Sequence, residues 1–232
     1  MTASSQFKDY KTENFFDEMF DERESLNSRV HYNKIFQRLD RLTESEIAER
    51  RQQADSSFLE HGITFTVYGD DGGTERIFPF DLIPRVIPES EWSLVEAGLR
   101  QRILAINLFL NDIYHGQKII KDGVIPKEIV LSSKNFRPEM VGFSPPQDVY
   151  AHICGTDLIR DENGTYLVLE DNARCPSGAS YLLENREIMK RAFPQTFGGM
   201  SVRPVEAYTD LLLRTLEHLS PRKSQKPVCV LL

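Results

Sequence analysis

The stretch that decides the fold reads Gly155-Thr-Asp-Leu-Ile-Arg-Asp-Glu-Asn-Gly-Thr-Tyr-Leu-Val-Leu-Glu-Asp-Asn172. Asn163-Gly164 stands between two apolar runs, which predicts a β-hairpin closed by a two-residue type I′ turn. That turn fixes a register in which Asp157 lies directly opposite Glu170. Because opposed residues share a face, the two carboxylates point the same way, and Asn172, two residues further along, joins them.

A carboxylate pair in this position needs something to offset its repulsion, because opposed side chains lie only about 4.5–5.5 Å apart at Cβ. A bound cation would do so, and two carboxylates with an amide oxygen suit Mg²⁺. No His or Cys stands on that face at ligand spacing, which disfavours zinc. A solvated acidic face and a protonated, hydrogen-bonded pair are the alternatives.

The loop after the hairpin suits an anion. It leads into a helix expected from Ser180, and backbone N–H groups before a helix N-terminus can hold phosphate. Arg174 is a candidate for binding phosphate, because a guanidinium forks onto phosphate oxygens. Its alternative is an ion pair with Asp171 or Glu184. The loop candidates for phosphate or substrate binding, whose alternative is plain turn and cap chemistry, are Ser177, Gly178 and Ser180.

Composition narrows the function class. The 232 residues carry 28 Lys plus Arg against 35 Asp plus Glu, a net charge of −7, which argues against nucleic-acid and anionic-membrane partners. No apolar run reaches the length of about 18 residues that a transmembrane helix needs. Three cysteines without a CxxC motif favour a reducing compartment, so a cytoplasmic location is expected.

Along the rest of the chain, helices and strands mix without strict alternation, which favours an α+β fold. Three segments are expected: an N-terminal arm and helices over 1–60, an α/β region with a hairpin and a long helix over 61–145, and the hairpin, loop and helices over 146–232. The arm should dock through its Phe residues, and Thr43-Glu-Ser-Glu46 is a capping box. The remaining expected elements are a hairpin over 63–80 turning at 70–73, a helix capped by Ser90 and ending near Tyr114, a strand over 128–131, helices over 180–193 and 208–219, and a final strand over 228–232.

Asp157, Glu170-x-Asn172 and Pro176-x-Gly178 resemble the magnesium motif of the ATP-grasp ligases, such as D-alanine–D-alanine ligase, although the loop here is one residue longer. A closer resemblance covers nearly the whole chain and is to the circularly permuted ATP-grasp family related to glutathionylspermidine synthase. Its motifs here are Phe16-Asp-Glu-Met-Phe20, Gly62-Ile-Thr-Phe-Thr-Val-Tyr-Gly-Asp-Asp71, Arg76-Ile-Phe-Pro-Phe-Asp-Leu-Ile-Pro-Arg85, Asn107-Leu-Phe-Leu110 and the run from Glu170 to Arg186.

This resemblance implies the N-terminal portion of a circularly permuted ATP-grasp fold, a mixed or antiparallel sheet with flanking helices, in a truncated chain. It implies ATP-dependent ligation of a small-molecule or peptide carboxylate to an amine through an acyl phosphate, with Mg²⁺ held by Asp157, Glu170 and Asn172. The nucleotide's lysines and adenine pocket would come from a region after Leu232. The alternatives are an inactive fragment, or a module needing a separately encoded ATP-binding half. A weaker alternative is a Mg²⁺-dependent phosphoesterase, since paired carboxylates also suit two-metal hydrolysis.

Overall fold

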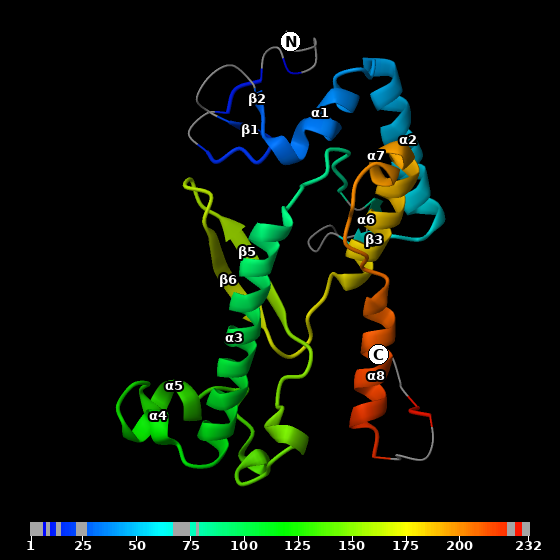
Figure 1. Cartoon of the computed structure of the whole chain (residues 1–232). Coiled ribbons are helices and arrows are strands. Elements are labelled where there is room, and N and C mark those ends of the chain that lie inside the picture. Colours follow the sequence, from blue (N-terminus) through cyan, green and yellow to red (C-terminus); the bar gives the residue numbers. More distant parts are fainter. Residues whose placement is uncertain are drawn as a thin grey trace. The chain divides into compact units, whose positions relative to one another are not determined.

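A computed structural model describes residues 7, 10–12, 15–21, 27–66, 75–77, 79–221 and 226–228. The chain divides into two units, Met1–Val86 with Gly178–Leu232, and Ile87–Ser177. The first unit is therefore assembled from both ends of the sequence. Each unit is described by itself (Figure 1).

The first unit contains most of the helices. Its elements are β1 (Phe20–Asp21), β2 (Asn27–Ser28), the 3₁₀ helix η1 (Val30–Tyr32), α1 (Asn33–Leu39), α2 (Glu44–Glu60), β3 (Thr64–Thr66), β4 (Glu75–Ile77), α6 (Ala179–Ala192), α7 (Pro194–Gly198) and α8 (Ala207–Leu219). The predicted helices over 180–193 and 208–219 are confirmed as α6 and α8. The predicted 63–80 hairpin is confirmed as β3 paired antiparallel with β4, while its turn at 70–73 lies outside the described residues.

Helix α2 begins where the local sequence predicts. The Thr43 side chain accepts a hydrogen bond from the Glu46 N–H, and the Glu46 carboxylate accepts one from the Thr43 N–H, which completes the capping box. This helix packs on α6 (Figure 1), and Phe58 and Ile188 are fully buried in the shared core. The N-terminal arm docks as expected through Phe20, which is buried in the same core.

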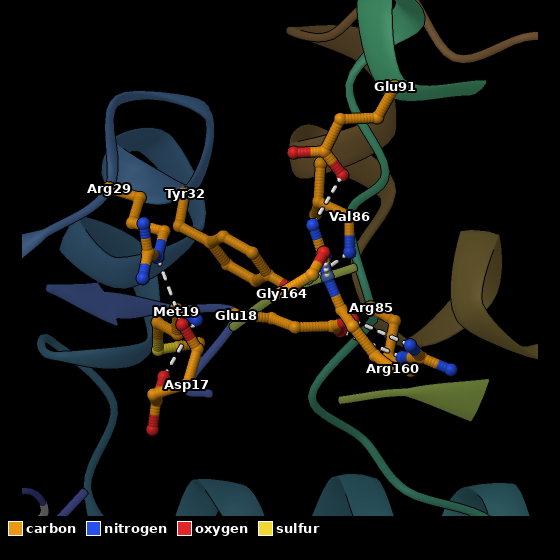
Figure 2. Close-up of polar contacts among 10 residues, drawn as sticks. All are labelled: Asp17, Glu18, Met19, Arg29, Tyr32, Arg85, Val86, Glu91, Arg160 and Gly164. Carbon is orange, nitrogen blue, oxygen red and sulfur yellow. Dashed lines mark hydrogen bonds and ion pairs between the residues drawn. The ribbon is translucent and has the colours of Figure 1, made fainter. Parts of the chain in front are cut away.

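Polar contacts fix the chain around η1 (Figure 2). The Asp17 carboxylate accepts hydrogen bonds from the backbone N–H groups of Met19 and Phe20, at 2.8 and 2.7 Å. Tyr32 is buried and its hydroxyl accepts a 2.7 Å hydrogen bond from the Val86 N–H. Burial raises the pKa of Tyr32 to about 12, and the bond from Val86 opposes part of that rise.

The second unit is built on one long helix. Its elements are α3 (Glu89–Tyr114), α4 (Lys118–Lys121), α5 (Lys127–Leu131), the 3₁₀ helices η2 (Pro138–Met140) and η3 (Pro146–Asp148), β5 (Gly155–Arg160) and β6 (Tyr166–Asn172). The residues that cap α3 differ from the expectation, because Pro88 is the N-cap and Ser90 already lies inside the helix. Figure 1 shows β5 and β6 beside α3.

The strand predicted over 128–131 is wrong, because these residues form α5. Pro126 is the N-cap of α5, and the Ser132 N–H bonds back to the Glu128 carbonyl. A short apolar run fits a strand or a buried helical turn equally well by pattern. Here Val130 packs with Ile113 and Tyr114 of α3, which favours the helix.

The described strands form three separate two-stranded antiparallel sheets, β1 with β2, β3 with β4 and β5 with β6. Antiparallel pairing with flanking helices agrees with the expected α+β class. The strand expected over 228–232 falls mostly on residues outside the described ones, and Val228 is in no strand. No described helix is long and apolar enough to cross a membrane.

Candidate functional site

The β5–β6 hairpin places Asp157 directly opposite Glu170, as predicted. The loop and the strand pairing that produce this register differ from the prediction. The Gly164 N–H bonds to the Asp161 carbonyl, and Asp161 and Thr165 close the loop. Gly164 has φ +81°, whereas Asn163 is not among the described residues with positive φ, so the turn is not type I′. The predicted two-residue turn is therefore wrong, and the loop holds three residues.

A β-bulge restores the predicted pairing. Leu158 pairs with Val168 and Asp157 pairs with Glu170, which leaves Leu169 between them without a partner. The longer loop shifts the register by one residue, and the bulge shifts it back. The carboxylate pair survives because these two changes cancel.

One face of the hairpin is fixed to α3 by charged groups. Asp171 accepts from Arg102 of α3 at 2.6 Å and from the Thr156 hydroxyl at 2.9 Å. Arg160 donates to Glu91 of α3 at 2.8 Å and to the Gly164 carbonyl at 2.9 Å (Figure 2). Arg160 therefore anchors the hairpin to α3.

The opposite face carries the predicted ligands. Glu170 and Asn172 flank Asp171 in β6, so their side chains point away from the side that meets Arg102. Asp157 and Glu170 are exposed, and the Asn172 amide nitrogen donates a 3.0 Å hydrogen bond to a Glu170 carboxylate oxygen. This bond leaves the amide oxygen of Asn172 and the second oxygen of Glu170 to accept from another group.

This donor set fits Mg²⁺ by its chemistry, because all of its ligand atoms are oxygens and two of the groups are carboxylates. The described residues contain no group of three or more His, Cys, Asp or Glu side chains that could hold a metal. The candidate set does not count as such a group, because its third member is the amide of Asn172 and not a His, Cys, Asp or Glu side chain. A cation there would need further oxygens from a ligand or water.

The loop after the hairpin lies against β5. A Cβ on Gly155 would come within 2.8 Å of the Pro176 Cβ, so only glycine allows this close approach. Arg174 and Ser177 are exposed. Of the two carboxylates considered as ion-pair partners of Arg174, Asp171 pairs with Arg102 and Glu184 pairs with His61.

Two predicted loop residues belong to the other unit. Gly178 is the N-cap of α6 with φ +94°, and its carbonyl accepts from the Leu182 N–H. Ser180 lies exposed in the first turn of that helix and is not its cap. The structure thus brings Asp157, Glu170 and Asn172 together, and Gly178 and Ser180 are described only within their own unit.

Sequence reasoning missed the role of Asn107 in α3. Its amide oxygen accepts from the N–H groups of Tyr150 and Ala151, at 2.8 and 2.9 Å. Its amide nitrogen donates to the Ala151 and Ile103 carbonyls, both at 3.1 Å. Asn107 therefore holds the chain just before β5 on α3. A polar residue among the apolar residues of a helix is the signal that could have identified it.

Comparison with known proteins gives one family and several relatives. Residues 84–232 match the family described as circularly permuted ATP-grasp type 2. An uncharacterized protein of Synechocystis is 44% identical over 98% of this chain and 47% of its own length. An uncharacterized protein of Mycobacterium tuberculosis H37Rv is 43% identical over 94% of this chain and 38% of its own length.

A protein of Frankia alni named putative glutamate–cysteine ligase 2-3 is 34% identical over 78% of this chain and 20% of its own length. The chain therefore spans less than half the length of the relatives it matches.

Proposed function

Because the chain belongs to the circularly permuted ATP-grasp type 2 family, we propose that it carries the Mg²⁺-binding part of an ATP-dependent carboxylate–amine ligase. The observation that carries this proposal is the pairing of Asp157 with Glu170, with Asn172 bonded to Glu170 on the same side of the strand. A relative named as a putative glutamate–cysteine ligase supports the ligase class.

In the proposed reaction, a carboxylate oxygen attacks the γ-phosphorus of ATP and ADP leaves, which forms an acyl phosphate. An amine then attacks the acyl carbon, phosphate leaves, and the amine loses a proton as the amide forms. Bound Mg²⁺ would supply charge neutralisation for the ATP phosphates. Oxygens of Asp157, Glu170 and Asn172 would hold it.

The remaining candidates would act on the anionic groups. Arg174 is exposed and makes no hydrogen bond with the described residues, so its guanidinium is available to bind the transferred phosphate or the acyl-phosphate oxygens. Ser177, Gly178 and Ser180 would bind phosphate or substrate through their N–H and hydroxyl groups. The relatives named as ligases favour an amino-acid carboxylate and amine.

Calorimetric titration of the chain with ATP and Mg²⁺ separates this proposal from that of an inactive module. Micromolar binding that requires Mg²⁺ supports the ligase proposal, and no binding favours a module that needs a separate ATP-binding half.

A trapping assay on the chain combined with an ATP-binding half then tests the chemistry. Hydroxylamine replaces the amine and converts an acyl phosphate to a hydroxamate, with glutamate as the first carboxylate tried. Hydroxamate and ADP formed in equal amounts support ligation. A phosphoesterase would instead hydrolyse a phosphate ester without forming hydroxamate, and this result would refute the ligase proposal.

A further inference from the structure

A basic pocket lies in the first unit, between α1 and the end of α7. Its volume is about 380 Å³, which falls within the range of about 300–1,000 Å³ that is typical of small-molecule sites. The residues that line it are Lys34, Gln37, Arg38, Arg41, Thr196 and Gly199.

The sequence places the cations together by helical spacing. Lys34 and Arg38 are one turn apart in α1, and Arg41 follows just past the end of that helix. Ile35 and Leu39, between them in sequence, are buried in the core of the unit. Burial of these apolar residues therefore turns the basic side of α1 outward.

Uncharged partners hold two of these cations in place. The Lys34 ammonium donates to the Gly199 carbonyl at 2.9 Å, and the Arg38 guanidinium donates to the Gln195 amide oxygen at 3.2 Å. These bonds order the side chains without neutralising them, and most of their N–H donors stay available.

The basic cluster takes part in no ion pair within the described part of the chain. No described carboxylate pairs with Lys34, Arg38 or Arg41, although Arg85, Arg102 and Arg160 each pair with one. Three adjacent cations without a partner repel one another, and this is unusual in a chain of net charge −7. An anionic ligand would remove that repulsion.

Thr196 adds a hydroxyl to the lining of the pocket. The residue is only 7% exposed, and its hydroxyl makes no hydrogen bond with the described residues. This hydroxyl is not among the buried side-chain atoms without a partner, so it faces the pocket, where a ligand oxygen could bond with it.

We propose that this pocket binds the phosphate group of a small phosphorylated molecule. A phosphate dianion offers several acceptor oxygens to two guanidinium groups and an ammonium, and Arg forks onto phosphate in two-point contacts. No residue of the β5–β6 hairpin lines the pocket. The proposed binding needs no metal and does not depend on the ligase proposal.

Calorimetry in a phosphate-free buffer with EDTA tests this site alone, because the chelator removes any cation from the hairpin. The probes are inorganic phosphate and AMP. Arg41→Gln is the informative variant, since the Arg41 side chain makes no hydrogen bond with the described residues and its loss should leave the fold intact. Arg51→Gln is the matched control, because it removes the same charge from α2 at a position that does not line the pocket.

We expect millimolar or tighter binding of at least one probe, weakened about tenfold by Arg41→Gln and unchanged by Arg51→Gln. Equal affinities for the two probes would assign the site to free phosphate, and tighter binding of AMP would assign it to a phosphate ester. The proposal is overturned if neither probe binds, or if the two variants weaken binding equally.

Discussion

Replacing Asn107 by alanine tests how the hairpin is held on α3. The Asn107 amide uses all of its hydrogen-bonding capacity, because it accepts from Tyr150 and Ala151 and donates to Ala151 and Ile103. The variant removes an acceptor from two backbone N–H groups, and Ala151 is 4% exposed. The chain before β5 then loses its attachment to the helix.

The cost follows from those two N–H groups. Leaving a buried donor without a partner costs about 1–3 kcal/mol, and these bonds are partly buried, so about 2–4 kcal/mol is expected in total. The opening equilibrium of this segment then rises by about 30- to 1,000-fold.

Hydrogen exchange of the amides over residues 149–160 measures this opening directly. Asn135→Ala is the matched control, because Asn135 is exposed in the same unit and its side chain makes no hydrogen bond with the described residues. Exchange accelerated less than about threefold in the Asn107 variant, or equally in both variants, would refute the reasoning.

Two further predictions concern pH and packing. Since the pKa of Tyr32 is raised from 10.0 to about 12, its neutral form stabilises the fold fully below pH 10, and this contribution is lost as pH rises toward 12. It amounts to about 2 kcal/mol after allowance for screening, and urea unfolding at several pH values should show a steeper alkaline loss in the parent than in Tyr32→Phe. Gly155→Ala would push a Cβ against Pro176 at 2.8 Å, so we expect about 1–3 kcal/mol of destabilisation in thermal unfolding. An unchanged melting temperature would contradict the close approach.

Local signals in the sequence predicted local structure well. The capping box at Thr43 and Glu46 depends only on neighbouring residues, and α2 begins there. Ser90 failed as a cap because the preceding Pro88 already occupies that position. The run over 128–131 failed because four apolar-rich residues do not distinguish a strand from a turn of helix.

The candidate site shows both the strength and the limit of strand periodicity. Alternation correctly separates Glu170 and Asn172 from Asp171, which meets Arg102. Gly164 fits the positive-φ position of a three-residue loop as well as a two-residue turn, and the bulge at Leu169 does not show in the alternation, so the predicted pairing holds only because loop and bulge compensate. The hydrogen bonds of Asn107 and the packing of α6 on α2 join residues that are far apart in sequence. Local sequence patterns therefore could not predict them.

The most direct test of the central claim is a titration with Mn²⁺, a paramagnetic substitute for Mg²⁺, followed by electron paramagnetic resonance. Glu170→Gln removes a proposed ligand charge, whereas Glu162→Gln makes the same change at an exposed position in the loop of the same hairpin. We predict that Glu170→Gln weakens Mn²⁺ binding by about tenfold or more, while Glu162→Gln leaves it unchanged. Equal Mn²⁺ affinity in the parent chain and both variants would contradict the proposed metal site.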